Sequence, residues 1–256
     1  MSEIDPQREI RRLSRRGLLW GAVAIAFGSE GIHYLNTQAS EDGLQWPFRR
    51  VLSLNEKLSE VYFSNRSLAR QFPLAEAKMP IVNEDIGLTD PLDAAAWRLK
   101  VIGGVADDLQ LTLADLMALP NVDTVTELRC IEGWSCVVHW TGCRLRDFVA
   151  KYPPKNRKVD VEKLETLPPY LGLETPDGEY YVGLDMASAL HPQTLLCWAM
   201  MGEPLSPGHG APLRLVIPVK YGIKNIKRIG KLIYTDARPR DYWAGNDEGY
   251  DWYAGL

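Results

Sequence analysis

The alternation of apolar and polar positions predicts several short strands separated by short helices. Trp97–Ile102 alternates apolar and basic residues and stops at Gly103, as expected of a half-buried strand. Val122–Ile131 is a longer strand-like run that has Cys130 near its end. We predict further strands at residues 180–184, 195–200, 213–218 and 231–234.

Helix signals are fewer and shorter. Thr112 can cap a helix that ends near Pro120, Leu145–Tyr152 has helical apolar spacing, and Asp185–Leu190 is typical of a helical turn. In the segment from about residue 40 to residue 96, which is otherwise irregular, only Leu54–Phe63 has a helical pattern. Strands interspersed with short helices predict a β-rich α+β fold and not a doubly wound sheet.

The N-terminus has the pattern of an export signal. Five arginines precede the short apolar run Leu18–Phe27, which is too short to span a bilayer unaided. Ser14–Leu19 resembles the twin-arginine export motif, which serves proteins that fold around a cofactor before translocation. The alternative is a basic amphipathic anchor on the membrane surface. Thr37–Ala39 is an imperfect cleavage site, so the segment is either removed or kept as a tether. Both interpretations place the protein in the periplasm.

Composition is that of a globular protein with one core. We expect a signal or tether at residues 1–40, an irregular extension contributing to the cofactor site at 41–96, and a single catalytic domain at 97–256. The net charge of −4 argues against nucleic acid as a partner, because binding to a phosphate backbone needs a basic surface. No glycine-rich phosphate loop follows a predicted strand, so nothing supports a nucleotide cofactor.

Cys130 is the first candidate for chemistry. The four cysteines, at positions 130, 136, 143 and 197, lack the close pairs that zinc sites use. For Cys136, Cys143 and Cys197 we expect core positions, although a disulfide between two of them is an alternative in an oxidising compartment. Cys130 differs because Glu132 and Trp134 follow it and a basic segment occurs later in the chain.

That basic segment has the features of an anion site. Gly208–Arg214 contains glycine and proline in a tight turn, whose backbone N–H groups can face a ligand closely. The guanidinium of Arg214 can bind an oxyanion through two parallel hydrogen bonds. Five more basic residues follow: Lys220, Lys224, Lys227, Arg228 and Lys231. In an acidic chain this concentration favours a small anionic ligand over a solvated charged face.

These motifs together carry a family resemblance. Arg129–Ser135, Gly210–Arg214 and Lys220–Lys227 resemble the molybdopterin-binding oxidoreductases of the sulfite oxidase superfamily, most closely the catalytic subunits of periplasmic protein-methionine-sulfoxide reductase. The resemblance implies a sulfite-oxidase-type fold and a molybdenum-molybdopterin cofactor (Mo-MPT). It makes the Cys130 thiolate the metal ligand. Glu132 would lie on the same face if the strand continues, and could position water or tune the metal.

The resemblance also implies the cofactor contacts. Arg214 and the Lys-rich loop would hold the terminal phosphate, and His209 stands where the reductase branch has an asparagine. Trp134 is expected in the core and His139 at the surface or the cavity rim. The implied contacts are Asn65, Leu68 and Ala69 (the last two by backbone), Thr175, His209, Arg214, Asn225, Ile226 (by backbone) and Lys227.

The activity implied is oxygen-atom transfer. We expect a monomeric catalytic subunit that reduces a sulfoxide-type substrate with electrons from a membrane b-type cytochrome. The chain has no haem-attachment motif and ends at Leu256, without the dimerisation domain of sulfite oxidases, and Ile131–Trp134 replaces their arginine-rich sulfite pocket. Two alternatives stay open: the same cofactor oxidising a small substrate and donating electrons to a cytochrome, and a periplasmic oxyanion-binding module without enzymatic activity.

Overall fold

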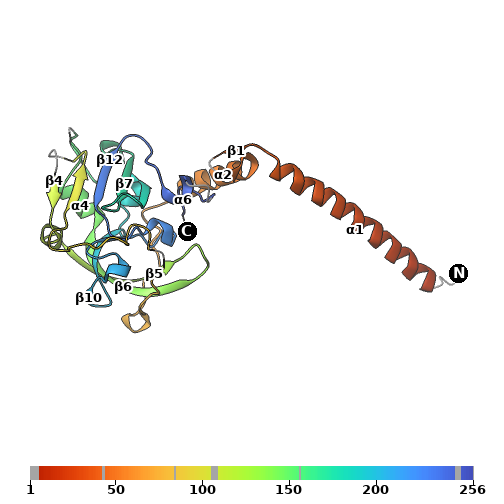
Figure 1. Ribbon diagram of the computed structural model, residues 1–256, viewed down its shortest axis with the longest axis horizontal. Helices are drawn as coiled ribbons and strands as arrows, with labels where there is room; N and C mark the ends of the chain where they lie inside the picture. Colours follow the sequence, from red (N-terminus) through yellow and green to blue (C-terminus); the bar gives the residue numbers. More distant parts are fainter. Residues whose placement is uncertain are drawn as a thin grey trace.

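A long N-terminal helix extends away from a β-rich body (Figure 1). The computed structural model describes residues 6–41, 44–83, 85–104, 109–155, 157–245 and 249–255, and only the backbone of residues 6–16. Helix α1 spans Pro6–Asn36. The two-stranded hairpin β1 (Ser40–Glu41) and β2 (Leu44–Gln45) follows, and helix α2 (Trp46–Tyr62) then leads into the body.

One of the two main sheets carries the predicted metal ligand at the end of a strand. Its order is β10-β9-β6-β5, and β11 also pairs with β9; all these pairings are antiparallel. Strands β5 and β6 form a long hairpin in which Asn121 pairs with Cys143 and Arg129 with Ser135. The strands are β5 (Asn121–Arg129), β6 (Ser135–Arg144), β9 (Leu195–Met200), β10 (Glu203–Pro204) and β11 (Arg214–Val216).

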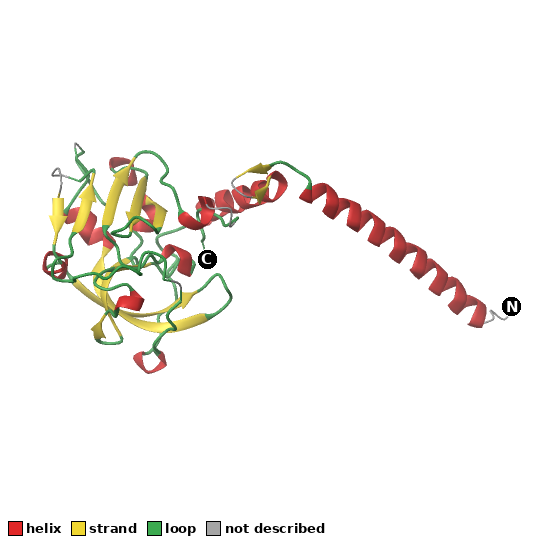
Figure 2. Ribbon diagram, viewed as in Figure 1, coloured by secondary structure: helices red, strands yellow, loops and turns green. Residues whose placement is uncertain are grey.

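The second main sheet has the order β4-β3-β12-β7-β8. Strands β3 and β12 are parallel, and the other neighbours are antiparallel. Figure 2 shows the strands of both sheets in the same body with short helices between them. The strands are β3 (Leu99–Ile102), β4 (Leu109–Leu111), β7 (Tyr170–Glu174), β8 (Tyr181–Asp185) and β12 (Lys231–Thr235).

Short helices and 3-10 turns lie in the segments that connect the strands. Helix α3 (Leu113–Met117) begins with a capping box in which Thr112 and Asp115 each bond the other's backbone N–H, which satisfies two donors at the helix start. The remaining elements are α4 (Leu145–Lys151), α5 (Met186–Ala189), α6 (Tyr242–Gly245), and the 3-10 turns η1 (Leu74–Glu76), η2 (Leu164–Thr166), η3 (Pro207–His209) and η4 (Gly222–Lys224).

The core joins the two sheets. Leu99, Leu173 and Leu232 from one sheet belong to the same buried cluster as Leu215 from the other and Phe148 from α4. A smaller cluster around Trp140 and Val216 lies on the β5-β6-β9 sheet. This arrangement makes one packed unit that holds the ends of β5, β11 and η4 in fixed positions.

The β-rich α+β prediction is confirmed, and the predicted strands are present within a few residues of their expected bounds. Six of the described strands were not predicted: β4, β6 and β7, and the two-residue strands β1, β2 and β10. Helix α2 begins at Trp46, eight residues before the expected Leu54, because Pro47 occupies its first turn, where a missing N–H has no cost. Helix α1 also continues past Phe27 to Asn36, and Gly17–Asn36 is long and apolar enough to cross a membrane. The expectation that this segment is too short was therefore wrong.

Candidate functional site

Cys130 lies in the tight turn between β5 and β6. Its N–H donates to the carbonyl oxygen of Trp134 over 2.9 Å, and the N–H of Gly133 donates to the carbonyl of Cys130 over 3.1 Å. Gly133 adopts φ 92°, which favours glycine. Strand β5 ends at Arg129, so the condition under which Glu132 was expected on the same face as Cys130, a strand continuing through it, is not met.

The turn nevertheless brings the carboxylate of Glu132 beside the sulfur. The thiol of Cys130 donates to Oε2 of Glu132, with 3.7 Å between sulfur and oxygen. The same oxygen accepts from the indole N–H of Trp134 over 2.9 Å and from the side-chain amide of Asn83 over 3.3 Å. The Asn83 amide nitrogen is also 3.9 Å from the Cys130 sulfur. Burial, and after it the Glu132 carboxylate, raise the pKa of the Cys130 thiol.

The basic segment approaches this turn closely. Gly222 opens η4 on the segment that follows β11. A Cβ added to Gly222 would lie 3.3 Å from the carbonyl oxygen of Arg129 and 3.5 Å from Cα of Cys130. The absence of a side chain at Gly222 therefore lets two segments separated by some ninety residues meet at the backbone of Cys130.

Arg214 is the buried cation of this region. It begins β11 and is 4% exposed. Its guanidinium donates to the carbonyl of His209 over 3.1 Å and to that of Asn225 over 3.4 Å, and it lies 5.0 Å from the centre of the Trp140 ring. Within the described ranges its Nε has no hydrogen-bond partner. Burial lowers the pKa of Arg214 to about 10, which leaves it charged at neutral pH.

Lys227 and His209 lie with Arg214 on the cationic side of the site. The ammonium of Lys227 donates to the carbonyl of Asn83 over 2.5 Å and to that of Gly208 over 3.5 Å. Asn83 therefore contacts the thiol side through its amide and the cationic side through its carbonyl. Burial, with smaller effects of Arg214 and Lys227, lowers the pKa of His209. Two cations acting on one imidazole mark a local positive field, which suits an anion.

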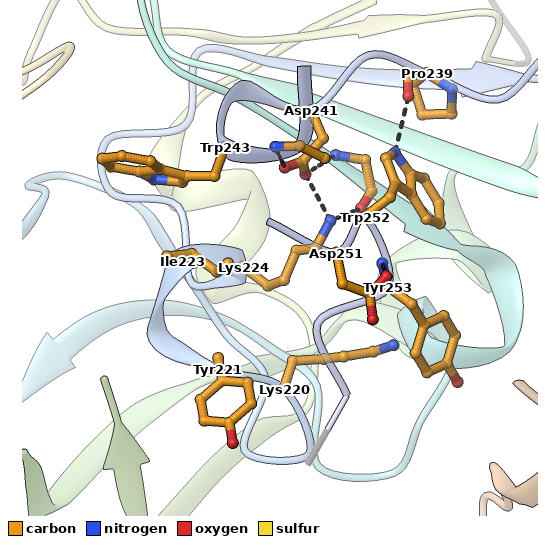
Figure 3. A network of polar contacts seen from close by, with 12 residues as sticks. Lys220, Tyr221, Ile223, Lys224, Pro239, Asp241, Trp243, Asp251, Trp252 and Tyr253 are labelled. Carbon is orange, nitrogen blue, oxygen red and sulfur yellow. Dashed lines mark hydrogen bonds and ion pairs between the residues drawn. The ribbon is translucent and has the colours of Figure 1, made fainter. Parts of the chain in front are cut away.

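The other basic residues of the segment are not part of this site. Lys224 is buried and donates to Asp241 over 2.6 Å and to the carbonyl of Gly183 over 3.0 Å; Lys220 lies beside Tyr253 (Figure 3). Lys231 pairs with Glu174 over 2.9 Å. Arg228 donates to the carbonyl of Asp90. The expectation that the whole Lys-rich loop faces an anion was wrong: of its basic residues Lys227 lines the cleft, whereas the buried Lys220, Lys224 and Arg228 contact protein groups and Lys231 pairs with Glu174.

The Cys130 turn, His209 and the cationic residues Arg214 and Lys227 line one open cleft, whose volume is about 940 Å³ when the space open to solvent is included. One side contains Cys130, Glu132 and Asn83, and the cationic side contains Arg214 and Lys227. The rest is mainly apolar and aromatic. Trp134, which we expected in the core, belongs to this wall, together with Pro80, Ile81, Ile86, Leu128, Ile131, Tyr180, Ile223, Trp243 and Tyr250.

The aromatic wall is held by hydrogen bonds from two segments. The indole N–H of Trp243 donates to the Tyr180 hydroxyl over 2.9 Å, and that hydroxyl donates to the carbonyl of Ile223 over 2.6 Å. Trp243 also packs edge-on against Tyr250, with ring centres 5.7 Å apart. Asp241 supports the start of α6 and is itself fixed by Lys224 (Figure 3). The buried ion pair therefore positions one wall of the cleft.

Six of the residues proposed from sequence lie together in the cleft: Cys130, Glu132, His209, Arg214, Asn225 and Lys227. Ile226 is buried beside it, and its carbonyl accepts from the N–H of Leu215 over 2.9 Å. His139 lies on β6 away from the cleft, and its ring is 3.1 Å from a carboxylate oxygen of Asp123. Each of the four cysteines has a free thiol.

Four other proposed contacts do not line the cleft. Asn65 and Leu68 are exposed, and the backbone of Ala69 exchanges two hydrogen bonds with the side chain of Gln193. Thr175 is buried, and its hydroxyl contacts Asp177 and the backbone of Tyr180, in the turn before β8.

The sequence interpretation missed Asn83, the asparagine that does reach the thiol. It lies in a stretch without regular periodicity, and its only signal is a polar residue directly after Pro80–Val82.

The donor set fits a molybdenum-pterin group. Within the described ranges no group of three His, Cys, Asp or Glu side chains could hold a metal ion. A metal bound by Cys130 would therefore need ligands brought by a cofactor, as the dithiolene of a pterin provides. The unpartnered buried Nε of Arg214, beside Lys227, suits a terminal phosphate.

Comparisons with known proteins identify the family. Residues 87–243, more than half of the chain, match the family described as oxidoreductase molybdopterin binding domain. A protein of Azospira oryzae named putative protein-methionine-sulfoxide reductase subunit YedZ1 is 40% identical over 164 residues, which cover 64% of this chain and 58% of that protein. The protein-methionine-sulfoxide reductase catalytic subunit MsrP of Campylobacter jejuni is 34% identical over 179 residues, 67% of this chain and 60% of that protein.

The fold has a relative among solved structures. The sulfane dehydrogenase SoxCD of Paracoccus pantotrophus superposes with a TM-score of 0.50 at 21% identity, covering 58% of this chain and 40% of that chain. The chain belongs to the molybdopterin-binding oxidoreductases of the sulfite oxidase family, and it is related to the MsrP catalytic subunits. It spans about three fifths of the length of the curated relatives it matches.

Proposed function

We propose that this protein is a periplasmic molybdenum oxidoreductase that reduces a sulfoxide-type substrate by oxygen-atom transfer. The observation that carries the proposal is the junction of Cys130, Glu132 and Asn83 on one side of a cleft that is cationic at Arg214 and Lys227 and otherwise mainly apolar and aromatic. Bound Mo-MPT supplies a two-electron redox centre that exchanges an oxygen atom with the substrate.

The chain's own residues have distinct tasks. The Cys130 thiolate would hold the metal, losing the proton that its thiol now shares with Glu132. The Glu132 carboxylate can hold a proton beside the reacting centre, and Trp134 fixes its orientation. Arg214 and Lys227 would bind the phosphate of the pterin. Asn225 holds the loop between them, because its side-chain oxygen accepts from the N–H of Ile217 over 2.8 Å.

The cleft favours a neutral substrate over sulfite. Around the thiol, the wall contains Trp134, Trp243 and Tyr250 and supplies no arginine among the described residues other than Arg214. A sulfoxide carries no net charge and has apolar substituents on sulfur, which can be desolvated against such a wall. Family membership also favours an enzyme over the oxyanion-binding module considered from sequence.

Helix α1 supports export and a membrane-bound electron donor. Its apolar segment begins within the Ser14–Leu19 motif and none of it is buried, as expected of a signal or an anchor. We propose the twin-arginine route for export, and a membrane b-type cytochrome as the electron partner of a monomeric catalytic subunit. Each reduction of a sulfoxide consumes two electrons, which this cytochrome would supply to the bound cofactor.

The direction of the reaction can be tested with artificial redox partners. We expect the purified protein to oxidise a reduced viologen dye when an aryl methyl sulfoxide is added. Reduction of ferricyanide with sulfite or a thioether, without any sulfoxide-dependent oxidation of the dye, would instead establish the oxidative direction.

A further inference from the structure

Helix α2 turns its apolar side away from the protein. Four aliphatic residues recur at spacings of three and four, as one helical face requires. Their exposed fractions are high, 56% for Val51, 57% for Leu54, 47% for Leu58 and 80% for Val61, and Tyr62 beside them is 81% exposed. We call these five residues the outer face of α2.

The opposite, largely polar side of α2 contacts the catalytic body. A guanidinium nitrogen of Arg49 donates to the carbonyl of Tyr250 over 3.4 Å, and Glu56 pairs with Arg238 over 2.7 Å. Ser53 and Ser59, on the same side, are half-buried. A helix packed on a soluble protein shows the reverse pattern, with apolar residues inward and polar residues outward. The polar contacts therefore hold α2 in an orientation that exposes its apolar residues.

The charges at the edge of the outer face are basic. Arg50 and Lys57, seven residues apart, lie on one flank of the apolar stripe, and both are exposed. Long basic side chains beside an apolar stripe are typical of helices that lie in the interface of an anionic membrane. The acidic residue Glu56 instead points to Arg238 on the body.

Helix α1, which precedes this surface in the chain, contains a segment that can cross a membrane. Gly17–Asn36 is 20 residues long, apolar enough to span, and none of it is buried. Only the hairpin β1–β2 separates α1 from α2, and the chain changes direction there (Figures 1 and 2). Tyr34 and Trp46 are exposed on the two sides of this junction, as aromatic residues are at membrane–water interfaces.

We propose that α2 lies along the surface of the bilayer that α1 crosses, with its outer face immersed at the boundary between headgroups and acyl chains of anionic phospholipids. The helix thereby fixes the orientation of the catalytic body. Arg49 contacts Tyr250, which lines the cleft, so one wall of the cleft is held near the membrane surface. The occupant is lipid and not a protein because the stripe directly follows a membrane-spanning segment and its exposed flank is cationic.

Photo-crosslinking of the full-length protein tests this surface. The photoreactive residue p-benzoylphenylalanine replaces Leu58 on α2, Ile25 on α1, or Leu164 on the catalytic body. Leu164 is a matched control, because it is 43% exposed and Leu58 is 47% exposed. Each protein is reconstituted alone in nanodiscs of phosphatidylcholine and phosphatidylglycerol, and lipid adducts are measured by mass spectrometry. Leu54 is a second position on the same face, used if the Leu58 variant does not fold.

We expect lipid adducts at positions 25 and 58 and several-fold fewer at position 164. Adducts at position 25 alone would show that the outer face is not immersed and would overturn the proposal. Absence of adducts at both 25 and 58 would overturn it as well, since α1 would not be inserted. In membranes from producing cells, crosslinking of position 58 to a protein in place of lipid would make the outer face a protein-docking surface and contradict the assignment.

Discussion

The thiol of Cys130 and the carboxylate of Glu132 share a hydrogen bond, with 3.7 Å between sulfur and oxygen, although β5 ends before either residue. The turn closed by Gly133 brings them together, and the indole of Trp134 holds the carboxylate in place. An acid fixed beside a candidate metal ligand can deliver or accept a proton where substrate binds, which is the basis of the first prediction.

Replacing Glu132 with Gln should lower kcat by about 10²-fold or more, the usual contribution of a positioned acid or base. The amide keeps an oxygen that can accept from Trp134, so molybdenum content and folding should be unchanged. Steady-state kinetics with a sulfoxide substrate, together with metal analysis, would measure both. The matched control is Glu127→Gln: Glu127 bonds Arg129 and Ser135 on the same hairpin and does not line the cleft. Equal loss in both variants would rule out a specific role for Glu132.

Lys227 and Lys231 form a second matched pair. Lys227 lines the cleft, whereas Lys231 pairs with Glu174 outside it. A charged hydrogen bond contributes about 1.5–3 kcal/mol, so Lys227→Met should weaken retention of the cofactor by about tenfold or more. Lys231→Met should retain it.

The measurement is pterin and molybdenum content after dialysis. Lys227→Arg separates the charge from the contact with Asn83, because it keeps the positive charge and should partly restore retention. Identical cofactor content in the Lys227→Met and Lys231→Met variants would contradict the phosphate assignment.

The stability of the folded protein should depend less on the charge of Lys220 than on that of Lys224. Burial lowers the pKa of Lys220 from 10.5 to about 7. Between pH 7 and 10.5 the Lys220 amine is therefore protonated in the unfolded chain and largely neutral in the folded protein. The free energy of unfolding should fall as pH falls from 10.5 to about 7 and change little from this source below it.

Lys220→Met should remove that pH dependence and should cost less stability at neutral pH than Lys224→Met, because Lys220 is 3.7 Å from a carboxylate oxygen of Asp185, whose side chain is 20% exposed and keeps contact with water. Lys224→Met should destabilise by about 3–5 kcal/mol, because it leaves the buried Asp241 without its cation. Urea unfolding in detergent across this pH range would measure both variants. A fall in stability for Lys220→Met as large as that for Lys224→Met would contradict the distinction.

Periodicity predicted β5 and β11, the strands next to Cys130 and at Arg214, because alternation reports which face of a strand is buried, but it did not predict β6. It did not reveal which cations are buried in ion pairs. Lys224 and Lys227 look alike in the sequence, yet one bonds Asp241 and the other faces the cleft. Such a difference depends on tertiary contacts and has no local signal.

Asn83 was missed for a related reason. Its segment, before Ile86, has no regular structure and is positioned by packing across the cleft, with Lys227 bound to its carbonyl. The resemblance instead indicated Asn65, which is exposed. The inverted polarity of α2 was also invisible before the structure, because an amphipathic pattern does not show which side faces the body.

Metal analysis of the full-length protein and of its Cys130→Ser variant tests the central claim most directly. Cys136→Ser is the control, since Cys136 lies on β6 and its thiol contacts the carbonyl of Lys78 outside the cleft. We predict molybdenum equimolar with the unmodified protein and with the Cys136 variant, an absorption band from thiolate-to-metal charge transfer, and loss of that band and of activity in a folded Cys130→Ser variant. Folded unmodified protein, isolated from the exported fraction without molybdenum, would contradict the account.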